Sequence, residues 1–393
     1  MYQGKFIFSQ IMDYSSWKVF HRCVQRYQGD HNVRKFTCSQ QYRAMAIAQL
    51  NRRSSLRDLV ICLKAHQEKL YHLGLYSGIS RSTLADANES RNWCIYSDYA
   101  QCLIAETRPL YGPEDSELNL HETVYALDSS TIDLCLSLFP WAPFRKTKSG
   151  IKLHTLLDLQ GNIPSFIKIT DAKLNDVNIL DEIIPESSAI YVMDRAYVDY
   201  ERLHTFHKCG SYFVVRAKSN TKYRRLYSYA NDRDHGLIYD QSGVLTGKNS
   251  AKRYPDKLRR IKYVDRKRDK TLIFLTNNTY LPALTIAELY KNRWQVELHF
   301  KWLKQHLRIK SFYGMSENAV KTQIWTAVSV YVLLAIIKKR LGLEASLYTI
   351  SQLVDTALFE KMPLYQLLTR HEYKPEPFDP YKQLNLFDLS SGH

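Results

Sequence analysis

The first 110 residues carry apolar side chains at helical spacing, in segments separated by short polar stretches. The periodic segments cover residues 15–26, 38–50, 55–72 and 81–106. A repeat near 3.6 residues places these side chains on one face of each helix, where they can be buried together. We therefore predict an all-helical region over residues 1–110.

One bend in this region has the form of a helix-turn-helix. A helix is followed by a turn containing Gly74 and Gly78, and a polar helix is expected to start after Ser80, whose hydroxyl can cap it. Arg81 lies in the first turn of that helix, which in a helix-turn-helix enters a DNA groove. The bend favours DNA binding at Arg81, and the alternative is an ordinary bend between helices that touches no DNA.

From about residue 120 the pattern changes to strands. Apolar and β-branched runs are separated by Ser-Ser, a Pro/Trp loop and Gln-Gly-Asn, and one helix is expected at about 174–184. The predicted strands are 122–128, 131–136, 151–159, 163–170, 189–194 and 211–218. This alternation predicts an α/β domain with a mixed sheet.

The stretch from 218 to about 283 differs from both neighbours. It is rich in Tyr, Lys and Arg, with eleven Lys or Arg against three Asp between Lys248 and Lys270. The runs LRRIKYV and KTLIFLT alternate like paired strands. We predict a basic β-rich insertion, followed by a charged helix and then an apolar helix at 322–340.

Two further segments bear on the class of protein. The run from Ile324 to Ile337 is too short to span a membrane and predicts a buried core helix. The N-terminus lacks the layout of a signal peptide, and the tail from about Tyr373 is expected to have little fixed structure. We expect a cytoplasmic protein with no membrane partner.

Composition narrows the choice of partner. The chain has 393 residues, a hydrophobic content of 45% and a net charge of +16, with a pI near 9.3. Such an excess favours a polyanion, most often nucleic acid, although a basic protein with an unrelated role is the alternative. Seven cysteines without CxxC spacing indicate neither zinc nor disulfides, and we expect reduced, mostly buried thiols.

A stripe of charged residues stands out in the segment YKNRWQVELHFKWLK. On one continuous helix, Tyr290, Arg293, Glu297 and Lys304 would fall within an arc of about 60°. A buried charged stripe needs compensation, which metal ions and phosphates can supply. The alternative is a solvated face with an Arg293–Glu297 pair at i, i+4.

Two aspartates join Glu297 as candidate metal ligands. Asp128 and Asp194 are each predicted to end an apolar strand, and strand ends in α/β sheets collect ligand sites. Three carboxylates in one pocket would repel unless Mg²⁺ or Mn²⁺ bound them. Pattern alone does not choose among the acids, because other aspartates lie at comparable positions. These competitors are Asp133, Asp158, Asp171 and Asp176.

The motifs resemble those of DDE transposases of bacterial insertion sequences, specifically the IS-four family that includes the Tn-five transposase. That family carries the signature Y-x2-R-x3-E-x6-K, which is complete here from Tyr290 to Lys304. Asp128 before hydroxyl residues matches its first aspartate. The segment Asp194 to Tyr197 matches its D-R-G-Y-like second segment, with Ala196 in place of glycine. KSGIKLH resembles its Lys-x-His strand, and the similarity spans residues 1 to about 345.

The resemblance implies a fold and its divisions. An RNase H-like catalytic core would be interrupted by the insertion and preceded by the helical DNA-binding domain. The implied divisions are 1–110 (helical), 111–217 (core, first part), 218–285 (insertion), 286–345 (core, second part) and 346–393 (C-terminal helix and flexible tail).

The resemblance also implies residue roles. Asp128, Asp194 and Glu297 would be catalytic and hold two Mg²⁺ ions, for which Mn²⁺ can substitute. Residues that would contact DNA are Tyr290, Arg293, Lys304, Arg195, Tyr197, Lys152, His154 and Arg81. Local packing is the alternative for Arg195 and Tyr197, and a core role is the alternative for His154. In the insertion, tyrosines could stack on bases, and the candidates are Tyr223, Tyr227, Tyr229 and Tyr254.

The implied function is cut-and-paste transposition. A homodimer would bind the terminal inverted repeats of its element, cut them, and join them to target DNA. The enzyme alternative is an RNase H-like nuclease that cuts without joining. The non-enzyme alternative is a catalytically silent, transposase-derived DNA-binding protein, against which the complete set of signature residues argues.

Overall fold

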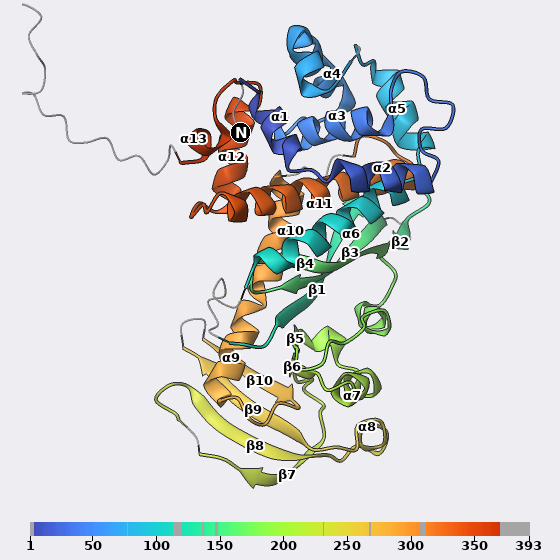
Figure 1. Cartoon of the computed structure of the whole chain (residues 1–393). Helices are drawn as coiled ribbons and strands as arrows, with labels where there is room; N and C mark the ends of the chain where they lie inside the picture. Colours follow the sequence, from blue (N-terminus) through green and yellow to red (C-terminus); the bar gives the residue numbers. More distant parts are fainter. Residues whose placement is uncertain are drawn as a thin grey trace, which may run out of the picture.

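The computed structural model describes residues 4–76, 78–112, 120–135, 137–145, 148–230, 232–266, 269–306 and 312–369. Helices gather at one end of the molecule, and a mixed sheet occupies the middle (Figure 1). The strands of the insertion form the opposite end (Figure 1). The active-site candidates lie on the central sheet and on the two helices that run along it.

The N-terminal part is helical, as predicted. Its elements are α1 (Ile7–Asp13), α2 (Trp17–Arg26), α3 (Cys38–Leu50), α4 (Leu56–Ala65), η1 (Gln67–Leu73), α5 (Arg81–Ser90), α6 (Cys94–Thr107) and η2 (Arg108–Leu110). The prediction of one helix over 55–72 is wrong. His66 leaves the α conformation, with φ −117° and ψ 30°, and the chain continues as the 3₁₀ helix η1. The Ser80 hydroxyl accepts a hydrogen bond from the Thr83 amide at 3.0 Å, which confirms the predicted cap of α5.

The apolar run is the middle of α11 (Glu317–Arg340), a core helix as predicted. By length and composition α11 could cross a membrane, but 94% of its most apolar window is buried against the rest of the protein. It packs on α3, α5 and α6 and is followed by α12 (Leu347–Ala357) and α13 (Leu364–Thr369). The predicted tail from Tyr373 lies outside the described residues.

The central sheet is mixed. Its strands are β1 (Val124–Leu134), β2 (Pro143–Arg145), β3 (Lys148–Asp158), β4 (Ile163–Asp171), β5 (Ile190–Met193) and β6 (Tyr212–Arg216). In space the order is β4, β3, β1, β5, β6. β3 runs antiparallel to both of its neighbours, β4 and β1, whereas β5 and β6 run parallel to β1. This is an RNase H-like core, which confirms the predicted α/β class.

The two strands predicted at 122–128 and 131–136 are one continuous strand, β1, so the prediction that Ser129 and Ser130 form a break is wrong. The partner strand β3 pairs with β1 from Tyr125 opposite Asp158 to Leu134 opposite Ser149. Backbone hydrogen bonds to β3 therefore hold the serines in extended conformation despite their preference for turns. Asp128 consequently lies inside a strand and not at its end.

The insertion is rich in β structure, as predicted. It contains β7 (Tyr223–Ser228), β8 (Leu237–Leu245), the short helix α8 (Lys248–Arg253), β9 (Leu258–Asp265) and β10 (Lys270–Thr276). The predicted pairing of LRRIKYV with KTLIFLT is confirmed, because Ile261 of β9 lies opposite Phe274 of β10. Phe274 also lies opposite Arg216 of β6, so the insertion extends the core sheet to ten strands among the described residues.

Each face of the sheet is covered by a different set of elements. Alternating residues such as Ala126 and Val192 join the core shared with α6, α9 (Ala283–Asn292), α10 (Trp294–His306) and α11. Their neighbours Leu127 and Met193 pack on the other face. That face is covered by η4 (Asp176–Asp181), η5 (Arg195–Tyr197) and α7 (Tyr200–Lys208). The predicted helix at 174–184 is therefore only the short 3₁₀ helix η4.

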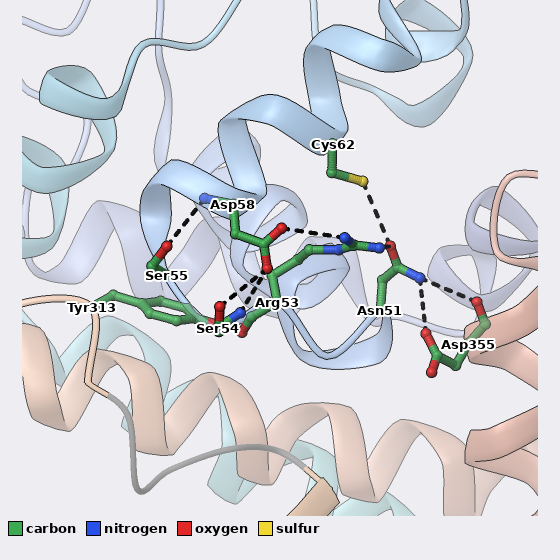
Figure 2. A network of polar contacts seen from close by, with 8 residues as sticks. All are labelled: Asn51, Arg53, Ser54, Ser55, Asp58, Cys62, Tyr313 and Asp355. Atoms are coloured by element: carbon green, nitrogen blue, oxygen red, sulfur yellow. Dashed lines mark hydrogen bonds and ion pairs between the residues drawn. The ribbon is translucent and has the colours of Figure 1, made fainter.

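A polar network joins the helical region to the C-terminal helices, as Figure 2 shows. The Asn51 amide donates to the Asp355 carbonyl at 3.1 Å and to its carboxylate at 2.9 Å. The Tyr313 hydroxyl donates to the Arg53 carbonyl at 2.6 Å. These contacts tie the turn between α3 and α4 both to α12 and to the segment that leads from α10 into α11.

The cysteines are all free thiols, which agrees with the prediction of no disulfides. The prediction that most are buried is wrong. Cys23, Cys38 and Cys62 are buried, whereas Cys102, Cys135 and Cys209 are exposed.

Candidate active site

Asp128 and Asp194 lie side by side on adjacent parallel strands. β1 and β5 pair in register from Val124 opposite Ile190 to Leu127 opposite Met193, and each aspartate is the next residue along its strand. Neighbouring strands are about 4.8 Å apart, and residues at equal register point to the same face. Asp194 follows the end of β5 as predicted, whereas β1 continues past Asp128. The in-register pairing therefore places the two aspartates level with each other on one face of the sheet.

Arg216 extends this row onto a third strand. β6 is parallel to β5, with Val215 opposite Met193, so Arg216 is the residue level with Asp194. The guanidinium also influences Tyr290 electrostatically. The sequence analysis missed Arg216 because the strand pattern of SYFVVRAK indicates a strand but carries no information about its register.

The helix that carries the signature is broken. α9 ends at Asn292, Arg293 forms a turn, and α10 begins at Trp294. Around the break the bonds are three residues apart, from Arg293 N–H to the Tyr290 carbonyl and from Val296 N–H to the Arg293 carbonyl. The prediction of one continuous helix with a single charged face is therefore wrong, although Tyr290 still reaches Asp194 and Arg293 still reaches Asp128.

Arg293 bridges two of the three candidate acids. One terminal nitrogen lies 2.5 Å from Asp128 Oδ2, and the other lies 2.6 Å from Glu297 Oε1. Burial raises the pKa of Asp128, and the Arg293 guanidinium only partly opposes this shift. Burial alone would lower the pKa of Arg293, but the Asp128 carboxylate and the bond to Glu297 raise it above its ordinary value. Arg293 is therefore a permanent cation at this site.

Tyr290 supports the second aspartate. Its hydroxyl donates to Asp194 Oδ1 at 3.1 Å, and its ring packs on Phe274 with centroids 4.9 Å apart. Burial, together with the nearby Asp194 charge, raises the pKa of Tyr290 to about 12. The phenol therefore stays protonated near neutral pH and acts as a hydrogen-bond donor.

Lys304, on α10, contacts β1 beyond Asp128. Its ammonium group donates to the Thr131 carbonyl at 2.7 Å, three residues beyond Asp128 on β1. α10 thus follows β1, with Glu297 near one end of the contact and Lys304 near the other.

The donor set suits a hard divalent cation. Three carboxylates are available, and oxygen ligands of this kind are those that Mg²⁺ and Mn²⁺ prefer. Within the described ranges no three His, Cys, Asp or Glu side chains stand together at the spacing of a metal site. Instead, Arg293 supplies the positive charge between Asp128 and Glu297.

Arg195 and Tyr197, which follow Asp194 closely and were expected to contact DNA, have different surroundings. Arg195 is exposed beside Asp194, and its guanidinium makes no hydrogen bond or ion pair with a described residue. Tyr197 is buried under the opposite face of the sheet, where burial raises the pKa of its hydroxyl. The expectation that Tyr197 contacts DNA is therefore wrong for this conformation, and its packing alternative holds.

The side chains of Lys152 and His154 both make contacts inside the protein. The Lys152 ammonium donates to the Leu174 carbonyl at 2.7 Å and pairs with Asp176 at 2.9 Å. His154 is fully buried, with Nε2 2.9 Å from Thr170 Oγ1, and burial lowers its pKa to about 4. Neither side chain is available for its expected DNA contact in this structure, because η4 and the segment before it lie over this face of β3.

The remaining expected DNA contacts differ in exposure. Arg81 is exposed on the first turn of α5. Of the insertion tyrosines, Tyr227 and Tyr229 are exposed, whereas Tyr254 is buried with its hydroxyl 2.8 Å from His207 Nδ1. Tyr223 donates its hydroxyl to backbone carbonyls of β8 and β9. Among these four candidates, Tyr227 and Tyr229 are the exposed ones that could stack on a base.

Comparisons with known proteins agree on one family. Residues 119–333 match the model described as a transposase DDE domain, and residues 3–76 match a domain of unknown function, DUF4372. The chain is 32% identical over 302 residues to the putative transposase y4zB of Sinorhizobium fredii, covering 76% of this chain and 81% of the relative. It is 30% identical over 227 residues to a probable transposase for insertion sequence element IS5377 of Geobacillus stearothermophilus, covering 55% and 57%.

A third relative and one solved structure extend these matches. The chain is 28% identical over 277 residues to a putative transposase for insertion sequence element IS4SA of Synechocystis, covering 65% of this chain and 71% of the relative. In three dimensions, 96% of the chain aligns with 83% of piggyBac transposase in a synaptic complex with hairpin DNA, with a TM-score of 0.44 and 9% identity.

Proposed function

The chain belongs to the DDE transposases of bacterial insertion sequences, and we propose that it cuts the ends of its own element and joins them to target DNA. The observation that supports this proposal best is the pairing of Asp128 and Asp194 on adjacent parallel strands, with Glu297 brought to Asp128 by the shared Arg293. The proposed substrates are the terminal inverted repeats and a target duplex.

Asp128, Asp194 and Glu297 would hold two Mg²⁺ ions, or Mn²⁺ in their place. Bound divalent ions supply an activated water or 3′-hydroxyl and stabilise the leaving oxygen of in-line attack at phosphorus. Tyr290 orients Asp194 through its 3.1 Å hydrogen bond, so this carboxylate is held in one rotamer before any ligand arrives. Asp128 is held in the same way by the guanidinium of Arg293.

Tyr290, Arg293 and Lys304 would contact phosphates near the cut. Arg293 is suited to this role because its guanidinium offers several N–H donors in a planar fork, which matches phosphate as well as carboxylate. Lys304 offers a single ammonium charge on a flexible stem. Exposed Arg195 lies next to Asp194 and would contact the DNA strand that is cut. Exposed Arg81 on α5 would bind DNA away from the cut.

The insertion would hold the unpaired DNA produced during release of the element. Tyr227 and Tyr229 are exposed there, with ring centroids 4.8 Å apart, and base–aromatic stacking tolerates any sequence. We further propose a homodimer on DNA, because two ends must be cut together, and a place in the bacterial cytoplasm at the nucleoid.

A strand-transfer assay tests the joining step. The purified chain is incubated with Mg²⁺, with duplexes carrying the ends that flank its coding region, and with a supercoiled plasmid. Insertion of the ends into the plasmid is expected. Cut ends without joined product would identify the nuclease alternative, and binding without any nick would identify the silent DNA-binding alternative.

A further inference from the structure

A cavity of about 660 Å³ opens between the start of α7, the connection from β6 to β7, and α8. Its lining is polar and cationic: Lys218, Lys222, Lys248, Arg253, Asn220, Thr221, Asn249, Ser250, Val198, Asp199, Tyr200 and Gly247. Pockets for small ligands of this size are mostly apolar. This cavity instead gathers four cations together with amide and hydroxyl donors, which is the chemistry that recognises phosphate.

Few acids balance these cations. Asp199 caps α7 through its own Oδ1, and its other oxygen lies 3.5 Å from Arg202. Arg253 has only a distant, exposed contact of 3.8 Å with Glu201. The ammonium groups of Lys222 and Lys248 make neither a hydrogen bond nor an ion pair with any described residue. Unopposed cations around one cavity repel one another, so an anion bound there would be stabilised.

The cavity begins where the row of active-site residues ends. Val198 lies four residues after Asp194, and Lys218 lies two residues after Arg216. The Lys218 ammonium donates to the Val198 carbonyl at 2.9 Å, which joins the two segments as they leave the strands. The signature helices lie on one face of the sheet, and α7 covers the other. Because Val198 and Lys218 leave the ends of β5 and β6, a DNA strand that passes the row of active-site residues would reach this cavity next.

We propose that this cavity binds backbone phosphates of a DNA strand that has crossed the Asp128–Asp194 row. The proposal rests on the function proposed above, which makes DNA the polyanion in question. Lys222 and Lys248 supply the charge, and the neutral side chains on the α8 rim donate hydrogen bonds to phosphate oxygens. The site is independent of base identity, since none of its determinants reads a base edge.

The test compares two double variants of the full chain, each losing two positive charges. Lys222→Ala with Lys248→Ala removes cavity cations, and Lys252→Ala with Lys257→Ala removes two exposed lysines of the insertion that do not line the cavity. Binding of a 20-nucleotide oligothymidylate is measured in EDTA at several salt concentrations. Two lost phosphate contacts lower the salt slope by about 1.4 and weaken binding about 25-fold at 0.1 M salt. The control pair should retain the slope of the unmodified chain.

A second measurement uses the unmodified protein. Bound oligothymidylate should protect Lys222 and Lys248 from acetylation, read by mass spectrometry, while Lys252 stays reactive. Equal binding losses in both double variants, or an unchanged slope in the cavity variant, would overturn the proposal. Protection by inorganic phosphate but not by the oligonucleotide would also overturn it and assign a small-anion site. Because binding is read without metal or cleavage, an inactive site in the strand-transfer assay does not affect this result.

Discussion

The guanidinium of Arg293 lies 2.5 Å from the carboxylate of Asp128, although the two residues are 165 positions apart in the chain. The pair is only 15% and 21% exposed, so each charge depends on the other for compensation. The same arginine also reaches Glu297. One side chain therefore holds together two acids that the proposed chemistry needs in one place.

Arg293→Ala should destabilise the metal-free protein by roughly 2 kcal/mol, because it leaves Asp128 partly buried without a counter-charge. Thermal unfolding in EDTA measures this loss. Millimolar Mg²⁺ should raise the unfolding midpoint of this variant more than that of the unmodified chain, since the cation then replaces the missing charge. Equal shifts in both proteins would contradict a cation site between these acids.

Asp128→Asn should make the metal-free protein more stable near neutral pH. The pKa of Asp128 is raised in the folded state, chiefly by burial, so its ionised form costs folding free energy above that pKa. Stability attributable to this group is full below the unfolded pKa and is lost as pH rises through the folded pKa. The advantage of the variant should therefore shrink as pH falls toward 4, as measured by denaturant unfolding across pH 4–8. A constant difference would rule out the titration of Asp128 as its cause.

Glu297→Gln should reduce cleavage by more than about a hundredfold while end binding stays within about twofold, because a ligand oxygen is lost but no DNA contact is. The Gln side chain can still accept from Arg293, and Glu297 is 58% exposed, so folding should be unaffected. Glu288→Gln, an exposed acid on α9, is the matched control. Loss of binding together with cleavage would indicate a folding defect and not a metal-ligand role.

Lys304→Ala should weaken binding of duplex ends and lower the salt slope by about 0.9, which is one phosphate contact. The comparison is Lys338→Ala at the end of α11, beside a cavity bordered by Leu298 and His299 of α10. Anisotropy titrations from 50 to 300 mM salt measure the slope. An unchanged slope would show that Lys304 makes no phosphate contact in the complex.

Asn51→Ala should cost about 1–3 kcal/mol of folding stability, since it removes two hydrogen bonds to Asp355 and leaves Arg53 without its Asn51 acceptor. Figure 2 shows Asn51 between Arg53 and Asp355. Metal-dependent cleavage per folded molecule should be unchanged, because the bonds of this network involve none of the three carboxylates Asp128, Asp194 and Glu297. Chemical denaturation and the cleavage assay on the same preparation separate the two effects.

Periodicity located most elements, but it failed where tertiary pairing overrides local preference. Ser129 and Ser130 indicate a turn locally, yet β3 keeps them extended through hydrogen bonds that no local pattern encodes. A continuous charged face was predicted from Tyr290 to Lys304, whereas the chain bends at Arg293 so that this side chain reaches Asp128. The bend changed the geometry without separating the residues.

The sequence identified some residues of the candidate site and missed others, for a related reason. The resemblance singled out Asp128, Asp194 and Glu297, because a linear signature is visible in sequence. Arg216 was missed, since its place beside Asp194 follows from strand register alone. His154 and Tyr197 were expected at the DNA because alternation and motif position do not reveal which face of a strand another element covers.

The pairing of β10 with β6 makes the insertion a poor candidate for removal by truncation. Without β10, the strand carrying Arg216 would present a row of unsatisfied amides and carbonyls to solvent. A shortened chain is then prone to self-association through that bare edge. Engineers seeking a minimal enzyme from this scaffold would need to retain at least the hairpin of β9 and β10.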